Sequence, residues 1–213
     1  MSSKRIRTSK EEGMVGDEQE VFTVHEGLIR ASSPFFNNAM AHDWKESQQR
    51  TIHLPDDEPE IFAVYMHWLY RRTLPVFCNE PGLPGTSEYL DLVKAYVLGF
   101  KILDLRFRDS TIDAIVEKSE SEARDGRCPC PSGEVVKYAL DNTNESAPIR
   151  ELLLDMCANW GRRTWLRLWA DCLPQSFLFE LASTLLDLRA DSDWYPEAYE
   201  YHYRRSDEGN SPR

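Results

Sequence analysis

The sequence predicts an α+β protein whose strands are confined to the N-terminal half. Two observations carry this prediction. Strand-forming residues gather in two short segments, 21–24 and 50–54. Elsewhere apolar residues recur every three or four positions, as in helices packed on a core. From residue 134 the pattern is helical only, so an all-α C-terminal extension is expected over residues 134–204.

The composition restricts the kind of partner. A chain of 213 residues can bury a sizeable core. Its net charge of −11 argues against nucleic acid or an anionic membrane and favours protein partners. The longest apolar run, residues 61–66, is too short to span a bilayer. No apolar signal segment is present at the N-terminus, and five scattered cysteines suit a reducing compartment. We therefore expect an intracellular protein of the nucleus or cytoplasm.

The first elements are short. Residues 1–13 are polar and are expected to form a disordered tail. The turn signal Gly16-Asp17, followed by the strand formers of residues 21–24, predicts a hairpin.

Two short helices and a strand are expected next. The first helix spans residues 25–31, and the second begins with Ser33 as its cap and Pro34 in its first turn and runs to about Met40. The strand covers residues 50–54, where apolar and polar side chains alternate.

Three longer helices follow. The first starts at the acidic, proline-containing segment 57–60, which has the form of a helix cap. The second begins near Ser87, and the third covers residues 105–116. Their predicted core faces are Ile61, Phe62, Tyr65, Trp68 and Leu69; Tyr89, Leu92, Val93, Tyr96, Val97 and Phe100; and Ile112, Ile115 and Val116.

Residues 119–133 combine charge, glycine and proline, as expected of a linker. Beyond them, helices are predicted around residues 135–140, from Pro148 to Trp160, and over residues 175–190. The face predicted for the last helix consists of Leu178, Leu181, Leu185 and Leu188. The aromatic segment 194–203 is expected to dock onto these helices, and residues 205–213 to form a disordered tail.

No residue pattern predicts a catalytic, cofactor or metal site. His25 has neither a nucleophile nor a positioned acid-base partner nearby in sequence, so a structural role is expected. Cys128 and Cys130 lack a second ligand pair at zinc-binding spacing. The carboxylates at residues 56–58 are explained by helix capping.

With these elements placed, residues 14–118 resemble a BTB (POZ) domain, of the kind found in small fungal proteins. The matching residues are Phe22, Val24, His25, Leu28, Ser33, Pro34, Phe35, Phe36, residues 44–47, Ile52, Leu54, Phe62, Trp68, Leu69, Tyr70, Thr73 and residues 96–103. The resemblance implies a helical cluster flanked by a small β-sheet. It also implies a non-enzymatic domain that binds other proteins.

Three departures from the family pattern affect what is expected. Residues 9–16 occupy the place of an apolar first strand but are too polar for a buried one, so this strand is expected to be short or missing. That weakens the expectation of a homodimer built by exchanging this strand. Glu26 stands where the family usually has a basic residue. No zinc fingers, Kelch repeats or channel segments follow the domain.

One motif suggests a partner. Some family members bind cullin scaffolds of ubiquitin ligases through an apolar-x-Glu motif, and Tyr89-Leu90-Asp91 is similar to it. Tyr89 also belongs to the predicted core face. The leading hypothesis is a protein-interaction adaptor, with a cullin-type ubiquitin ligase as the candidate partner. The alternative is a self-associating structural or nuclear regulatory protein that uses homotypic contacts.

Overall fold

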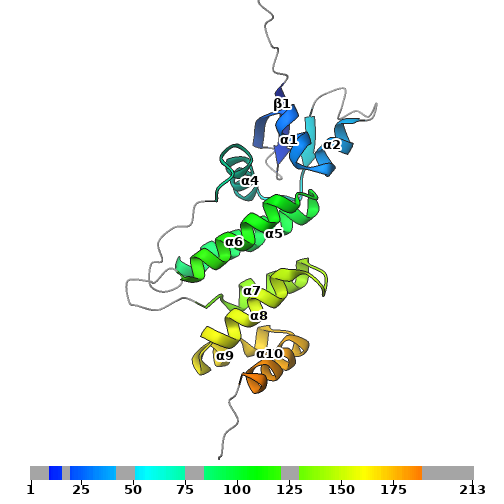
Figure 1. Cartoon of the computed structure of the whole chain (residues 1–213). Coiled ribbons are helices and arrows are strands. Elements are labelled where there is room, and N and C mark those ends of the chain that lie inside the picture. The colour runs from blue at the N-terminus through cyan, green and yellow to red at the C-terminus, as the bar shows by residue number, and fades with distance from the viewer. Residues whose placement is uncertain (1–9, 16–19, 42–50, 75–83, 121–129, 189–213) are drawn as a thin grey trace, which may run out of the picture.

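The computed structural model describes residues 10–15, 20–41, 51–74, 84–120 and 130–188. Two antiparallel helices, α5 (Pro84–Lys101) and α6 (Leu105–Glu120), cross the middle of the molecule. Figure 1 shows the sheet and the first helices on one side of this pair and the C-terminal helices on the other. The predicted α+β fold, with strands only in the N-terminal part, is confirmed for the described residues.

The sheet has three strands in the order β2-β1-β3. The strands are β1 (Lys10–Val15), β2 (Glu20–His25) and β3 (Thr51–Leu54). Strand β1 pairs antiparallel with β2, from Lys10 opposite His25 to Val15 opposite Glu20. It pairs parallel with β3, from Glu12 opposite Thr51 to Val15 opposite Leu54. The predicted hairpin is therefore present.

The first strand was expected to be short or missing, and it is present as a strand of 6 residues. Strand β1 has the same length as β2 and lies between the other two strands, so Lys10 to Gly13 do not belong to a disordered tail. The physical reason is backbone pairing. A central strand forms hydrogen bonds along both of its edges, and this pairing holds a segment whose side chains alone give little strand propensity.

The helices of the N-terminal half lie close to their predicted positions. They are α1 (Glu26–Ser32), α2 (Pro34–Ala41) and α4 (Pro59–Arg71). Ser33 caps α2 as predicted, because its Oγ accepts a hydrogen bond from the backbone N–H of Phe36 at 3.2 Å. The cap residue of α4 is Glu58, and its side chain makes no capping hydrogen bond.

The N-terminal core lies between the sheet, α1, α2, α4 and one face of α5 and α6. The predicted face of α4 is buried as a whole, from Ile61 to Leu69. Helix α5 contributes Ala95, Leu98 and Ile102 of the following turn. These residues pack around a set of aromatic rings formed by Phe36, Phe62, Tyr65, Trp68 and Phe107.

The C-terminal core uses another set of α5 and α6 residues. Tyr89, Leu92, Val93 and Tyr96 of α5 join Ile115 of α6 in packing against the extension. The extension contains α7 (Gly133–Asn142), α8 (Pro148–Trp160), α9 (Arg163–Trp169), a 3₁₀ turn η1 (Ala170–Cys172) and α10 (Gln175–Asp187). The extension is thus packed directly on the α5–α6 pair.

The C-terminal end of the predicted linker is tightly packed. Pro131, Ser132 and Gly133 are buried, and Ser132 Oγ accepts a hydrogen bond from the N–H of Val135 at the start of α7. A Cβ atom on Gly133 would lie 2.5 Å from Cβ of Trp169, so only glycine fits this close approach. Residues 121–129 lie outside the described part of the chain.

Several predicted core positions are exposed instead. Phe100, Leu185 and Leu188 have exposed fractions of 40%, 44% and 56%. In α10 the buried residues are Phe177 and Leu181. The helical period was right, but the sequence did not show which of several apolar faces meets the core. The segment 194–203, expected to dock onto the helices, and residues 205–213 lie outside the described residues.

Candidate functional site

The residues that carry the family resemblance lie mainly inside the N-terminal half. Val24, Ser33, Phe36, Trp68 and Leu69 are buried. A further pair, Phe22 and Leu28, is partly buried against the same core, and Pro34 is exposed at the first position of α2. These positions hold the scaffold in shape and leave little side-chain surface for a partner.

His25 is held by Tyr70. The hydroxyl of Tyr70 accepts a hydrogen bond from the backbone N–H of His25 at 3.1 Å, and it lies 2.7 Å from Nδ1 of the same residue. The two rings meet edge to face at 5.7 Å. Both residues are exposed, yet they tie the end of β2 to the last turn of α4. The arrangement is a structural link between two elements.

A buried carboxylate joins three helices of the N-terminal half. Asp104 accepts hydrogen bonds from Ser32 Oγ at 2.5 Å, from Tyr65 Oη at 3.2 Å and from the backbone N–H of Phe107 at 3.1 Å. Burial and the neighbouring charge of Asp104 raise the pKa of Tyr65. All of these contacts are internal, so the network positions α1, α4 and α6 relative to one another.

The proposed cullin-contact residues point in different directions. Tyr89 is fully buried in the C-terminal core, where the Nζ atom of Lys118 lies 5.3 Å from the centre of its ring. Asp91 is exposed on the outer side of α5. Partial burial raises the pKa of Asp91, against the opposing effect of Lys94. Of this pair, Asp91 is the residue a partner can reach.

Asp91 belongs to a charged surface formed by the start of α4 and the outer side of α5. Two ion pairs connect the helices: Asp57 Oδ2 lies 2.7 Å from Nζ of Lys101, and Glu58 Oε2 lies 2.6 Å from Nζ of Lys94. We call the surface formed by these four residues and Asp91 the α4–α5 surface. Two further exposed carboxylates, Asp56 and Glu60, border it.

A shallow pocket lies within the α4–α5 surface. Its apolar lining comes from Ile61, Val97 and Leu98, and Tyr138 of α7 closes one side. Burial raises the pKa of Tyr138, and the nearby negative charge of Glu58 acts in the same direction. The surface thus joins residues of the N-terminal half and of the helical extension.

The sequence contained a signal for this arrangement that the capping interpretation missed. The acidic segment before α4 was explained by capping alone, whereas Asp57 and Glu58 pair with α5. Lys94 and Lys101 are seven residues apart, which places them two turns apart on one face of a helix. Two basic residues on one face of a helix indicate a partner with two carboxylates.

The α4–α5 surface has the side chains needed to bind a partner protein. Asp56, Glu60 and Asp91 are exposed carboxylates that form no ion pair within the described part of the chain. Next to them lies the apolar lining of the pocket. Such a surface fits a partner segment that combines a basic side chain with an apolar one.

Cys130 and Cys157 lie next to each other in the structure. The hydrogen bond with Cys130 and burial in the C-terminal core raise the pKa of Cys157. Cys78 and Cys128 lie outside the described residues. Over the described residues, no three His, Cys, Asp or Glu side chains are grouped as metal ligands would be.

In a comparison with known protein families, residues 14–95 match the family model of the BTB/POZ domain. The match covers the sheet from Met14, the helices α1, α2 and α4, and α5 up to Ala95. No helix in the described ranges combines the length and apolar character needed to cross a membrane.

Proposed function

This chain contains a BTB/POZ domain, a protein-interaction module, and we propose that it acts as a non-enzymatic adaptor that binds a cullin-type ubiquitin ligase scaffold. The observation that supports this proposal is the exposed position of Asp91 on α5, one turn before Lys94, which lines a pocket of charged and apolar side chains. Tyr89 is buried, so the contact would use Asp91 and its surface neighbours instead of the Tyr89-Leu90-Asp91 motif as a unit.

The helical extension contributes Tyr138 of α7 to the pocket in the α4–α5 surface. Tyr138 lines the pocket together with Lys94 and Lys101 of α5. A partner bound over the pocket would therefore contact both the BTB/POZ domain and α7. Larger contact areas favour a stable complex, and this supports a role for the extension in widening the binding surface.

A binding experiment tests the adaptor proposal. The full chain is titrated with the N-terminal region of a purified cullin, and binding is measured by calorimetry. We expect Asp91→Lys to weaken binding on the order of tenfold or more, because it reverses a charge in the interface. The control is Asp109→Lys, which reverses an exposed charge on α6. Absence of binding by the wild type, or equal binding by both variants, contradicts the proposal.

A second candidate function is supported by the sheet. The expectation against a homodimer depended on a first strand that is short or missing, and β1 is present as the central strand. BTB/POZ domains mediate dimerisation as well as binding to other proteins. A self-associating structural or nuclear regulatory protein predicts concentration-dependent dimers in sedimentation experiments, without any second chain. A strictly monomeric protein at micromolar concentration excludes this alternative.

A further inference from the structure

Helix α9 presents positive charge to the solvent in a fixed orientation. Trp165 faces inward, because its Nε1–H donates a hydrogen bond to the carbonyl oxygen of Pro131 at 2.7 Å. Trp169 faces inward four residues later and packs on Gly133. With these two rings anchored, Arg163 and Arg167 lie one turn apart on the outer side of the helix and are exposed.

Apolar side chains flank these arginines. Leu166 and Leu168 lie on either side of the arginine pair and have exposed fractions of 39% and 69%. We call the surface formed by Arg163, Leu166, Arg167 and Leu168 the α9 surface. Exposed leucines beside a pair of arginines are typical of surfaces that bind a segment with both acidic and apolar side chains.

The charge of the α9 surface is not neutralised by the described residues. Neither Arg163 nor Arg167 forms an ion pair with a described carboxylate. By contrast, Lys94, Lys101, Lys118 and Lys137 each contact an aspartate or glutamate. In a chain of net charge −11, two adjacent exposed arginines without a described ion pair favour an acidic ligand.

The chain itself supplies an acidic and aromatic segment close to this surface. Residues 191–203 contain no lysine or arginine. Their acidic residues are Asp191, Asp193, Glu197 and Glu200, and their aromatic residues are Trp194, Tyr195, Tyr199, Tyr201, His202 and Tyr203. The segment therefore carries the charge and the apolar side chains that complement the α9 surface.

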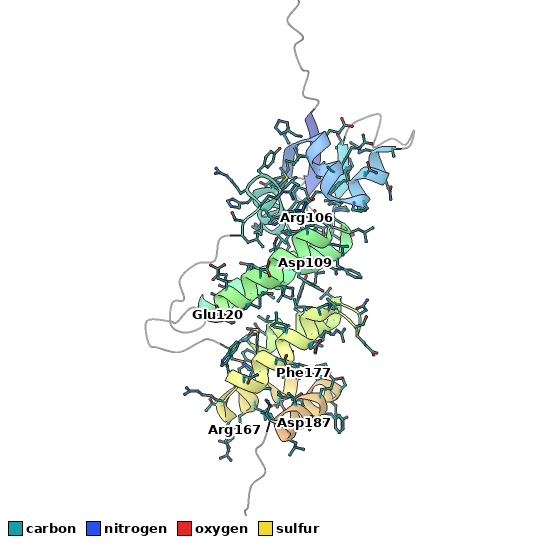
Figure 2. All side chains as sticks on the ribbon, viewed as in Figure 1. Arg106, Asp109, Glu120, Arg167, Phe177 and Asp187 are labelled. Atoms are coloured by element: carbon teal, nitrogen blue, oxygen red, sulfur yellow. The ribbon has the colours of Figure 1, made fainter. Side chains whose placement is uncertain are left out.

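The position of α10 makes this contact sterically feasible. Figure 2 shows Arg167 of α9 and Asp187, the last residue of α10, at the same end of the molecule, away from the sheet. The segment begins directly after this point. Six residues of extended chain from Leu188 span about 20 Å, so Trp194 can reach a neighbouring helix.

We propose that the α9 surface is a docking site for residues 191–203 of the same chain. In this contact the aspartates of the segment lie against Arg163 and Arg167, and Trp194 covers Leu168. Exposed ion pairs contribute modestly, and burial of an aromatic ring adds a larger apolar term. The segment is thereby held against the extension, opposite the end that carries the sheet.

Hydrogen exchange of the full chain, followed by mass spectrometry, tests the proposal. In the wild type we expect peptides within residues 191–203 to exchange on the order of tenfold more slowly than an unstructured peptide of the same sequence. The double variant Arg163→Glu, Arg167→Glu should remove this protection. Adding Asp191→Arg and Asp193→Arg to that variant should restore it, because the charges are then exchanged between the two sides.

The matched control is Arg71→Glu, Arg106→Glu. Both residues are exposed, lie on α4 and α6, and form no ion pair with described residues. This control should leave the protection unchanged. Wild-type exchange at the unstructured rate overturns the proposal, and so does protection that persists in Arg163→Glu, Arg167→Glu. Protection that increases with protein concentration also overturns it, because the occupant is then a second copy.

Discussion

The two cores on either side of α5 and α6 are built from different side chains. In the N-terminal core, aromatic rings contact one another in a continuous set, with centroids 4.9–6.4 Å apart. In the C-terminal core, aliphatic residues of α7, α8 and α10 predominate. Large rings fit together in few ways, whereas aliphatic side chains can be exchanged with little change in packing.

This difference explains why the two halves carry different kinds of information in their sequences. Positions in the aromatic core are specified by residue type, so an ordered motif can identify the family. Positions in the aliphatic core are marked in the sequence mainly by the helical spacing of apolar residues. A period alone does not separate Leu181, which is buried, from Leu185, which is exposed on the same helix.

The first prediction breaks the aromatic core. Trp68→Ala should lower the free energy of unfolding by about 3–5 kcal/mol, because a large ring is removed from a fully packed site. Trp68 packs on Tyr65 and Phe107, and its Nε1–H donates to Ser110 Oγ at 2.8 Å. The measurement is urea unfolding followed by circular dichroism.

The control for this substitution lies in the other half. Trp160→Ala removes the same side chain from the end of α8, where 38% of the residue is exposed. It should cost clearly less than Trp68→Ala. Equal losses for the two variants would mean that the aromatic core is not the more demanding of the two.

The second prediction concerns the ion pair where the C-terminal core meets the ends of α5 and α6. Lys118 is fully buried and contacts Glu88. Glu88→Ala should lower the free energy of unfolding by about 3 kcal/mol, because it removes a carboxylate that pairs with a buried ammonium group. Asp141→Ala, which removes the exposed Lys137–Asp141 pair, should cost less than about 0.5 kcal/mol.

A double variant separates charge from packing. Glu88→Ala combined with Lys118→Met removes the buried charge together with its partner and keeps an apolar chain in place. We expect it to recover most of the stability lost in Glu88→Ala. A double variant no more stable than the single one would show that the lost stability comes from the packing of Glu88 instead.

Local sequence signals predicted most of the N-terminal elements. The Ser33-Pro34 helix start, the apolar face of α4 and the strand before it all depend on neighbouring residues, and the structure has each of them. The turn signal Gly16-Asp17 predicted the hairpin of β1 and β2, whereas the central place of β1 could not be predicted locally, because its second partner strand lies 39 residues away, as for Glu12 and Thr51. Backbone pairing leaves no mark on side-chain composition.

The candidate site was less predictable than the fold. Asp91 was found as part of a motif, but the burial of Tyr89 depends on how α5 packs against α7 and α8. The ion pairs of Asp57 and Glu58 with α5 join residues 44 and 36 positions apart. Interactions over such distances follow from the tertiary fold, and no local pattern specifies them.

The last prediction tests where the aliphatic core ends on helix α10. Phe177 and Phe179 lie two residues apart on α10, with exposed fractions of 3% and 73%. Phe179→Ala should change the free energy of unfolding by less than about 0.5 kcal/mol, because its ring is not part of the packed interior. Phe177→Ala should cost about 3–5 kcal/mol. Urea unfolding of both variants measures the difference, and a large loss for Phe179→Ala would show that a further part of the chain packs on the outer face of α10.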